Sequence, residues 1–254
     1  MNQQKMFRFC FGCDPSDVSA KVIMTPFFPL KYFSDGPAAA YFKGKLYSGF
    51  NLGEGKKKVT VTYCGIGDKL LGDAVLLLGG AAVKKIMFIG TCGGFKTSDI
   101  GDIVVAKSAF NGEGFSRYLE QGFSMQKFIE GKNPTIPVDT MNDEVMKYLS
   151  ERVGKEKIKE GKIFTIGSLM AETYENLRDI EENGFIGIEM ELSAVYAAAN
   201  QIKAAATGLL LVSDKPLEKG LEEIPDPEEL LRFRQGFTDL PRLAAEFMTE
   251  KILF

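Results

Sequence analysis

Residues 186–216 read IGIEMELSAVYAAANQIKAAATGLLLVSDKP, and this stretch determines the fold expected for the rest of the chain. A short apolar strand ends at Glu189 and Glu191 and passes into an alanine-rich helix. The run 208–213 then predicts a second strand, buried on both faces and ending at Asp214. Acidic side chains at the carboxyl ends of such strands lie where open α/β sheets bind ligands.

Glu191 and Asp214 can each also be interpreted as purely structural residues. Glu191 could cap the helix that follows it, and Asp214 could begin a turn before Pro216. Each acid taken alone fits a structural role as well as a functional one.

The length and composition are those of an ordinary globular protein. The 254 residues are 45% hydrophobic and 26% charged, and we expect one domain spanning residues 1–254. The net charge of −3 gives no basic surplus, so nucleic acid is not an expected partner. There is no apolar stretch of about 18 residues, and residues 1–9 do not resemble a secretion signal. We therefore expect no membrane partner and a cytoplasmic location.

The chain contains no histidine, which limits its chemistry. Serine–histidine and cysteine–histidine pairs are excluded, as is zinc binding by histidine. Only one CxxC pair occurs among the cysteines, Cys10, Cys13, Cys64 and Cys92, so we expect reduced thiols and no metal site. Acid–base steps must then use Asp, Glu, Lys, Tyr or Cys.

The remaining pattern predicts strands and helices without an internal repeat. Residues 1–21 contain no clear periodic element. Strands are expected at 21–24, 45–50, 58–64, 85–89, 102–106 and 161–165, and helices at 69–78, 141–153, 172–182 and 230–252. The strands within 45–64 are expected to pair as a hairpin, and residues 215–229 to form a loop.

Two glycine-rich segments follow predicted strands. Gly65, Gly67 and Gly72 lack the GxGxxG spacing of dinucleotide folds, and the next strand does not end in the required acid. A nicotinamide cofactor is therefore disfavoured, and a dinucleotide-dependent oxidoreductase is a weak alternative. Residues 90–94, GTCGG, are expected to form a turn whose amides could approach an anion or sugar, although turns that only reverse the chain are commoner.

Five segments stand in a recognisable order: YCGIG at 63–67, FIGTCGG at 88–94 with GDIV at 101–104, GEGFS at 112–116, EME at 189–191 and VSD at 212–214. Together they resemble the nucleoside phosphorylase and nucleosidase superfamily, which includes purine nucleoside phosphorylase, uridine phosphorylase, methylthioadenosine nucleosidase and the catalytic domain of AMP nucleosidase. The resemblance implies an α/β domain with a central mixed β-sheet flanked by helices. It also implies a homo-oligomer, such as a dimer or hexamer.

The resemblance further implies cleavage of the bond between ribose and base in a nucleoside or nucleotide, with a purine as the expected base. Asp214 would protonate the departing base, provided burial raises its pKa, and Glu191 would hold the ribose hydroxyls. Met190, beside Glu189, would pack against the ribose. The other positions expected at the substrate are Gly67, Thr91, Cys92 and Gly93 in the glycine segments, and Phe164, Ser168, Met170 and Glu172 as candidates to contact the base.

Two cations typical of the phosphorylases are missing. One arginine position is occupied by Phe88, and the arginine of an N-terminal Gly-Asp-Pro loop is replaced by Asp17 in the segment 12–17. Because a phosphate dianion needs charge-assisted partners, these losses favour hydrolysis without a cofactor. Phosphorolysis, with phosphate as co-substrate, stays open, because other cations could substitute: an arginine of another chain, Lys43, Lys45, Arg117, Arg232 or Arg234. A non-catalytic nucleoside-binding protein is a further alternative, although binding alone would not require Asp214.

Overall fold

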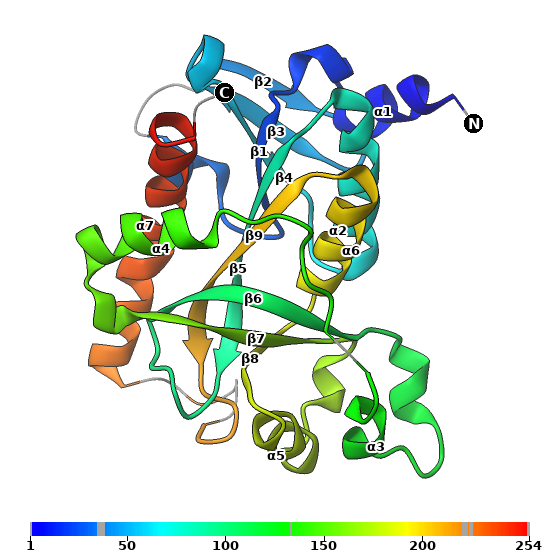
Figure 1. The fold of residues 1–254 in the computed structure, drawn as a ribbon, viewed down its shortest axis with the longest axis vertical. Helices are drawn as coiled ribbons and strands as arrows, with labels where there is room; N and C mark the ends of the chain where they lie inside the picture. The colour runs from blue at the N-terminus through cyan, green and yellow to red at the C-terminus, as the bar shows by residue number, and fades with distance from the viewer. Residues whose placement is uncertain (1, 35–38, 133, 220–222, 224–225, 253–254) are drawn as a thin grey trace.

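The computed structural model describes residues 2–34, 39–132, 134–219, 223 and 226–252, which form an α/β fold (Figure 1). The strands are β1 Lys21–Thr25, β2 Ala39–Lys43, β3 Ser48–Leu52, β4 Val59–Tyr63, β5 Lys85–Gly94, β6 Ile103–Gly112, β7 Ile158–Ile166, β8 Phe185–Glu189 and β9 Ala205–Asp214. The helices are α1 Gln3–Phe11, α2 Asp68–Leu78, α3 Met125–Ile129, α4 Asn142–Val153, α5 Tyr174–Glu182, α6 Leu192–Ile202 and α7 Pro227–Glu250.

The described strands form one mixed nine-stranded sheet in the order β2-β3-β4-β1-β5-β8-β7-β6-β9. An additional pairing between β5 and β9 closes the strands from β5 to β9 into a ring. β4, β1, β5 and β9 are joined by parallel pairings, so their carboxyl ends meet at one edge of the sheet. The predicted fold class, a central mixed sheet flanked by helices, is confirmed.

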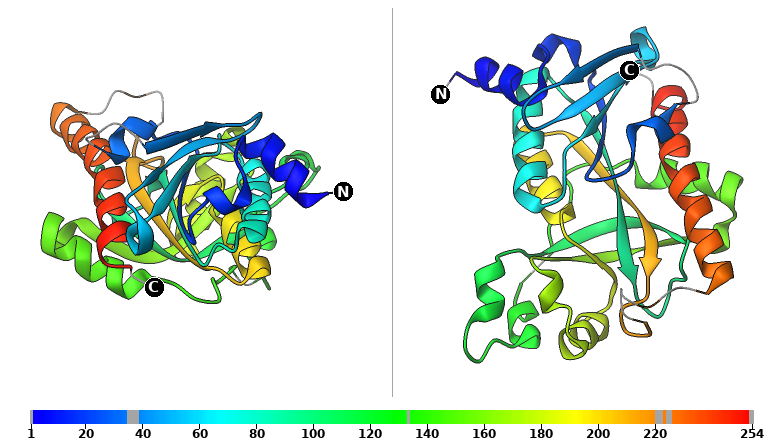
Figure 2. Two further views of the ribbon diagram at one scale, coloured as in Figure 1. Left: turned by 90° about the horizontal axis from the view of Figure 1, so that it is seen from above. Right: turned by 180° about the vertical axis from the view of Figure 1, so that it is seen from behind.

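Helices cover both faces of the sheet, as Figure 2 shows from two further directions. α1, α2 and α6 pack on one face, α4 and α7 on the other, and α3 and α5 cover one end. In β9, Leu210 and Val212 face the first layer, whereas Leu209 and Leu211 face the second. The prediction of a central strand buried on both faces is therefore confirmed. No helix in the described part of the chain is both long and apolar enough to cross a membrane.

The prediction that residues 1–21 contain no clear periodic element was wrong, because they include α1. The buried residues of this helix, Phe7, Cys10 and Phe11, have the i, i+3, i+4 spacing of one helical face. The helix ends at once, because Gly12 adopts a left-handed conformation with φ of 76°. One apolar stripe within nine residues is too short for its periodicity to be recognised.

The prediction of a turn at residues 90–94 was also wrong. β5 continues through all of them and pairs with both β8 and β9. The glycines allow close packing of neighbouring side chains: a Cβ atom at Gly94 would lie 2.5 Å from Ser98 Oγ and 2.7 Å from Val212 Cγ1. This segment is therefore a strand that carries residues to the edge where β9 also ends.

The predicted hairpin is confirmed, with β3 and β4 paired antiparallel. α7 begins at Pro227, earlier than expected, because Asp226 and Glu229 form a capping box at its start. Part of the loop predicted at 215–229, residues 220–222 and 224–225, lies outside the described residues.

Candidate active site

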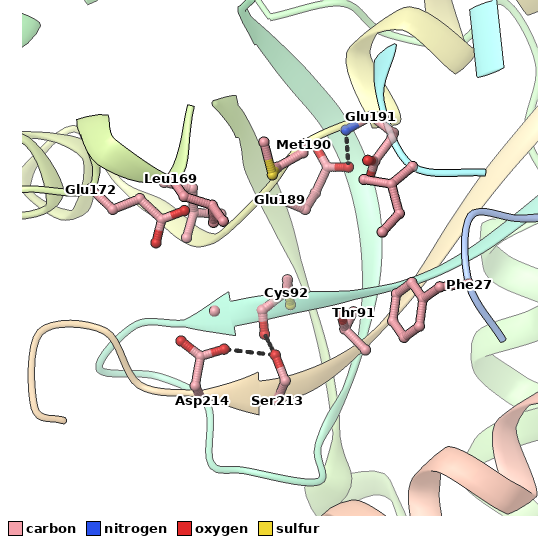
Figure 3. A pocket seen from close by; sticks show the side chains of 13 residues that line it. Phe27, Thr91, Cys92, Leu169, Glu172, Glu189, Met190, Glu191, Ser213 and Asp214 are labelled. Carbon is pink, nitrogen blue, oxygen red and sulfur yellow. Dashed lines mark hydrogen bonds between the residues drawn. The ribbon is translucent and has the colours of Figure 1, made fainter. Parts of the chain in front are cut away.

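A cleft of about 190 Å³ opens where β5, β8 and β9 end (Figure 3). Its lining residues are Phe27, Ile66, Thr91, Cys92, Gly93, Leu169, Glu172, Ile188, Glu189, Met190, Glu191, Ser213 and Asp214. Four of these described residues are carboxylic acids, and none is a lysine or an arginine. The cleft therefore combines apolar surface with an excess of hydrogen-bond acceptors.

A β-bulge in β9 brings Asp214 to the cleft wall. Cys92 pairs with Val212 whereas the next residue, Gly93, pairs with Asp214, so Ser213 is the extra residue. Bulges bend a strand and redirect its side chains. The Ser213 hydroxyl lies 3.2 Å from the Cys92 carbonyl oxygen and 2.6 Å from Asp214 Oδ1 (Figure 3). The bulge thus fixes Asp214 through the side chain of its neighbour.

Glu191 does not cap its own helix. It occupies the N-cap position of α6 but makes no capping hydrogen bond there. Its Oε1 atom instead accepts a hydrogen bond of 2.8 Å from the backbone N–H of Gly67, the N-cap residue of α2. The amino-terminal ends of two helices therefore meet at this carboxyl group, and such ends favour a negative charge.

Glu189 performs the capping that was considered for Glu191. Its Oε2 atom accepts hydrogen bonds of 2.7 Å from the backbone N–H groups of Glu191 and Leu192. Its Oε1 atom accepts a hydrogen bond from the Thr165 hydroxyl. The side chain is only 5% exposed. Glu189 thus lines the cleft, but both of its oxygens are engaged in holding α6 in place.

Burial raises the pKa of all four cleft acids. It raises the pKa of Asp214, an effect that the Ser213 hydroxyl partly opposes, and it raises the pKa of Glu172 to about 7 with a further contribution from the Asp214 charge. Burial also raises the pKa of both Glu189 and Glu191, while backbone N–H groups oppose the rise. Carboxyl groups whose pKa is raised in this way are candidates for proton transfer.

Most positions predicted to contact the substrate line the cleft: Asp214, Glu191, Met190, Glu189, Thr91, Cys92, Gly93 and the candidate Glu172. Gly67 is not a lining residue and acts through its hydrogen bond to Glu191. The four cysteines are free thiols. Cys92 is buried, and burial raises its thiol pKa well above the ordinary value, so this thiol is not primed as a nucleophile.

The other three candidates for base contact do not line the cleft. Phe164 is fully buried and stacks on Phe110 with 5.0 Å between ring centroids. The Ser168 hydroxyl accepts a hydrogen bond from the backbone N–H of Met170, whose own side chain is 87% exposed. Ser168 and Met170 belong to a short 3₁₀ turn at Leu169–Ala171 and its N-cap, and Leu169 is the residue of this turn that lines the cleft.

Both positions at which a phosphorylase arginine was expected lie outside the cleft. Phe88 is 1% exposed and packs in the core beneath α2 and α6. Asp17 precedes β1 and lines a separate cavity of about 640 Å³, whereas the segment after β1 reaches the cleft through Phe27. The suggested substitutes do not line the described cleft either: Lys43, Lys45, Arg117, Arg232 and Arg234.

Sequence analysis missed five lining residues: Phe27, Ile66, Leu169, Ile188 and Ser213. Ile66 lies inside the first glycine segment and Ser213 directly precedes Asp214, so their positions carried a signal. Phe27 carried none, because only the fold brings the segment after β1 to this edge.

Comparison with known proteins places the chain in a family. The model of the Phosphorylase superfamily matches residues 17–247, so the chain belongs to this superfamily. Among curated relatives, a DeoD-type purine nucleoside phosphorylase of Brevibacillus brevis is 29% identical over 206 residues, which cover 77% of this chain and 82% of that protein. The Buchnera aphidicola (Schizaphis graminum) protein of the same name is 26% identical over 157 residues, 58% of each chain. The chain spans 58–64% of the length of this and two further relatives of that name.

Solved structures share the fold across nearly the whole chain. Uridine phosphorylase from Vibrio fischeri has a TM-score of 0.72 at 19% identity, with 98% of both chains covered. AMP nucleosidase from Bacteroides thetaiotaomicron has a TM-score of 0.68 at 18% identity and covers 99% of this chain and 100% of its own. Purine nucleoside phosphorylase from Toxoplasma gondii, in complex with immucillin-H, has a TM-score of 0.70 at 20% identity and coverage of 94% and 95%.

Proposed function

We propose that this chain is an enzyme that cleaves the N-glycosidic bond of a purine nucleoside by hydrolysis. The observation that carries the proposal is the composition of the cleft, which has four carboxylic acids and no lysine or arginine among its described lining residues. Glu191 and Phe27 lie toward one end, and Asp214 and Glu172 toward the other (Figure 3). The ribose would occupy the first end and the base the second.

In this proposal Asp214 is the general acid. Cleavage moves the electron pair of the bond between C1′ and the base onto the base, so a proton from Asp214 stabilises the leaving group. Burial raises the pKa of Asp214 and outweighs the opposing hydrogen bond that the Ser213 hydroxyl donates to its carboxylate. Burial therefore favours the protonated form that a general acid needs.

Glu191 would anchor the sugar. A carboxylate can accept hydrogen bonds from two ribose hydroxyls, and its negative charge stabilises the positive character that develops on the ring. Met190 adds an apolar surface and Thr91 a hydroxyl to the same cleft. Water would add to C1′ and lose a proton, and reprotonation of Asp214 from solvent would restore the starting state. No cofactor takes part in this scheme.

Hydrolysis is favoured because a phosphate group would enter an acidic cleft without a charged partner. The same argument disfavours a nucleotide, whose 5′-phosphate carries the same kind of charge. Phosphorolysis is the second candidate, and the names of the DeoD-type relatives support it. It would require cations from another copy of the chain in a homo-oligomer.

A non-catalytic nucleoside-binding protein is the alternative from another class. The partly buried carboxyl group of Asp214 counts against it, because such a group has a desolvation cost that simple binding would not require. The test is incubation of the purified full chain with adenosine, inosine, guanosine, uridine and AMP, with release of free base followed by chromatography. Base release from a purine nucleoside supports the proposal, and binding without release supports the alternative.

A further inference from the structure

Glu113 is a partly buried acid that the proposed reaction does not use. It belongs to the GEGFS segment at 112–116 and directly follows β6. Glu113 is not among the described residues that line the cleft, and it lies in a separate groove of about 490 Å³ between α2 and α6. Its backbone N–H donates a hydrogen bond of 3.1 Å to Asn111 Oδ1, which fixes the start of the loop that carries it. Any effect of Glu113 on a substrate in the cleft must therefore pass through other residues.

One contact of Glu113 is with the first turn of α6. The Ser193 hydroxyl donates a hydrogen bond to Glu113 Oε1. The backbone N–H of Ser193 donates to Thr165 Oγ1 at 3.0 Å. Thr165 in turn donates to Glu189, which caps α6. Because Ser193 is only 1% exposed, water cannot easily replace a lost partner of its hydroxyl, and Glu113 completes the set of side chains that hold this turn.

The second contact of Glu113 is with the first residue of α2. The carboxyl groups of Glu113 and Asp68 share a hydrogen bond. Asp68 directly follows Gly67, which donates to Glu191. Burial raises the pKa of Glu113 and the charge of Asp68 raises it further, whereas the Ser193 hydroxyl opposes the rise. Two carboxyl groups can share a hydrogen bond only when one of them carries a proton, so this pair holds a proton between the two helices.

The two contacts join the helix starts that meet at Glu191. α2 and α6 lie side by side (Figure 1), and a Cβ atom at Gly72 would lie 3.7 Å from Ala194 Cβ. On the cleft side, the hydrogen bond from the Gly67 N–H to Glu191 Oε1 links the two helix starts. On the groove side, Glu113 links them. A change in the spacing of the helices would therefore disturb the bond that orients Glu191.

We propose that Glu113 is a positioning residue that holds the Glu191 carboxyl group in register with the ribose hydroxyls. It acts through Ser193 of α6 and Asp68 of α2. This inference rests on the proposed role of Glu191 as ribose anchor and goes beyond it by assigning the residue that keeps the anchor in place. Loss of Glu113 should weaken the interactions that depend on the ribose hydroxyls and spare those with the base.

The test uses the purine ribonucleoside that the wild-type chain cleaves or binds best, together with its 2′-deoxy and 3′-deoxy analogues. The readout is the hydroxyl preference, defined as kcat/KM for the ribonucleoside divided by kcat/KM for each analogue. We expect Glu113→Ala to reduce this preference by about 10-fold for at least one analogue. Glu113→Gln should retain most of it, because the amide oxygen can accept from Ser193 and the amide N–H can donate to Asp68. Glu120→Gln, at an exposed position nearby, is the control and should leave the preference unchanged.

A double variant tests whether Glu113 acts through the ribose anchor. In a Glu191→Ala background there is no carboxyl group to position, so adding Glu113→Ala should change the hydroxyl preference little. A further reduction of the preference by the same factor as in the wild-type background would mean that Glu113 acts independently of Glu191, and would contradict the inference.

The remaining outcomes separate the inference from the function on which it rests. If the wild-type chain binds these nucleosides but releases no base, the proposed function fails, and the hydroxyl preference measured as a ratio of calorimetric dissociation constants decides the inference. An equal loss for all three nucleosides in Glu113→Ala would show a general structural role and overturn it. If the alanine variant does not fold, Ser193→Ala removes one of the two contacts, and an unchanged preference in that variant overturns the inference. Absence of both binding and cleavage would refute the role of Glu191 and this inference with it.

Discussion

Glu191 Oε1 accepts a hydrogen bond of 2.8 Å from the backbone N–H of Gly67, which lies 124 positions earlier in the chain. This contact joins the start of α2 to the start of α6 and fixes the carboxyl group at the cleft. A carboxylate has about four acceptor positions, so the bond to Gly67 leaves others for ribose hydroxyls. The glycine-rich segment that contains Gly67 therefore contributes to the site by positioning the carboxyl group of Glu191.

Replacing the general acid should affect catalysis much more than binding. Asp214→Asn keeps the size of the side chain but removes the transferable proton, so kcat should fall by about 10²–10⁴-fold. The dissociation constant for the nucleoside, measured by calorimetry, should change little. Asp143→Asn, at an exposed position of α4, is the control. Equal losses of binding and turnover would mean that Asp214 has a structural role.

Replacing the ribose anchor should impair binding and turnover together. Glu191→Gln can keep the acceptor for the Gly67 N–H, but it loses the charge that strengthens bonds to the ribose hydroxyls. We expect kcat/KM to fall by about 10- to 100-fold, shared between a higher KM and a lower kcat. Steady-state kinetics with the preferred nucleoside measures this change. Wild-type kinetics in this variant would refute the assignment of Glu191.

Removing the Ser213 hydroxyl should change the pH dependence of the reaction. The hydroxyl opposes the burial-induced rise in the pKa of Asp214, because it donates to the charged form. In Ser213→Ala that opposition is lost, so the pKa of Asp214 should rise further and the acid should keep its proton to higher pH. The alkaline limb of the kcat profile should therefore move to higher pH, and a shift to lower pH would contradict the assignment.

Glu172 should make the free protein less stable at alkaline than at acidic pH. Its pKa is about 7 in the folded chain against an ordinary value of 4.5, so the folded state binds more protons between these values. Stability from this group is present below about pH 4.5 and is lost as pH rises toward 7. Glu172→Gln should therefore stabilise the protein relative to wild type by about 1–3 kcal/mol more at pH 8 than at pH 4.5.

Urea unfolding at the two pH values measures this difference. Glu175→Gln, at an exposed position nearby, is the matched control and should show no such dependence. A stability difference between Glu172→Gln and wild type that is the same at both pH values would mean that the folded environment does not perturb Glu172.

The sequence predicted the structure correctly where a local pattern of apolar or acidic residues reflects the position of a strand in the folded sheet. The apolar run 208–213 predicts a central strand because β9 is covered on both faces, and the acids at strand ends lie in the cleft because parallel strands share an edge. The same reasoning fails at 90–94, where glycines suggest a turn. These glycines instead allow close packing, for example of Gly93 against Ile188 and Pro216 and of Gly94 against Val212. These neighbours come from distant parts of the sequence and leave no local pattern.

The base end of the cleft was the least predictable part. Phe164 lies in β7 and packs in the core, whereas Ser168 and Met170 lie at a short 3₁₀ turn. Within this turn the direction of each side chain decides whether it reaches the cleft, as Leu169 does, or the solvent, as Met170 does. Phe27 reaches the cleft only because β1 pairs with β5 in the assembled sheet. Such long-range pairings leave no local signal in the sequence.

Isotope tracing of the reaction products tests the central claim most directly. The chain would be incubated with its preferred purine nucleoside in H₂¹⁸O, with and without phosphate, and the sugar product analysed by mass spectrometry. We predict base release that does not depend on phosphate, with one ¹⁸O atom incorporated into free ribose. Release that requires phosphate and yields unlabelled ribose 1-phosphate would contradict hydrolysis and would mean that another copy of the chain supplies the cations missing from this cleft.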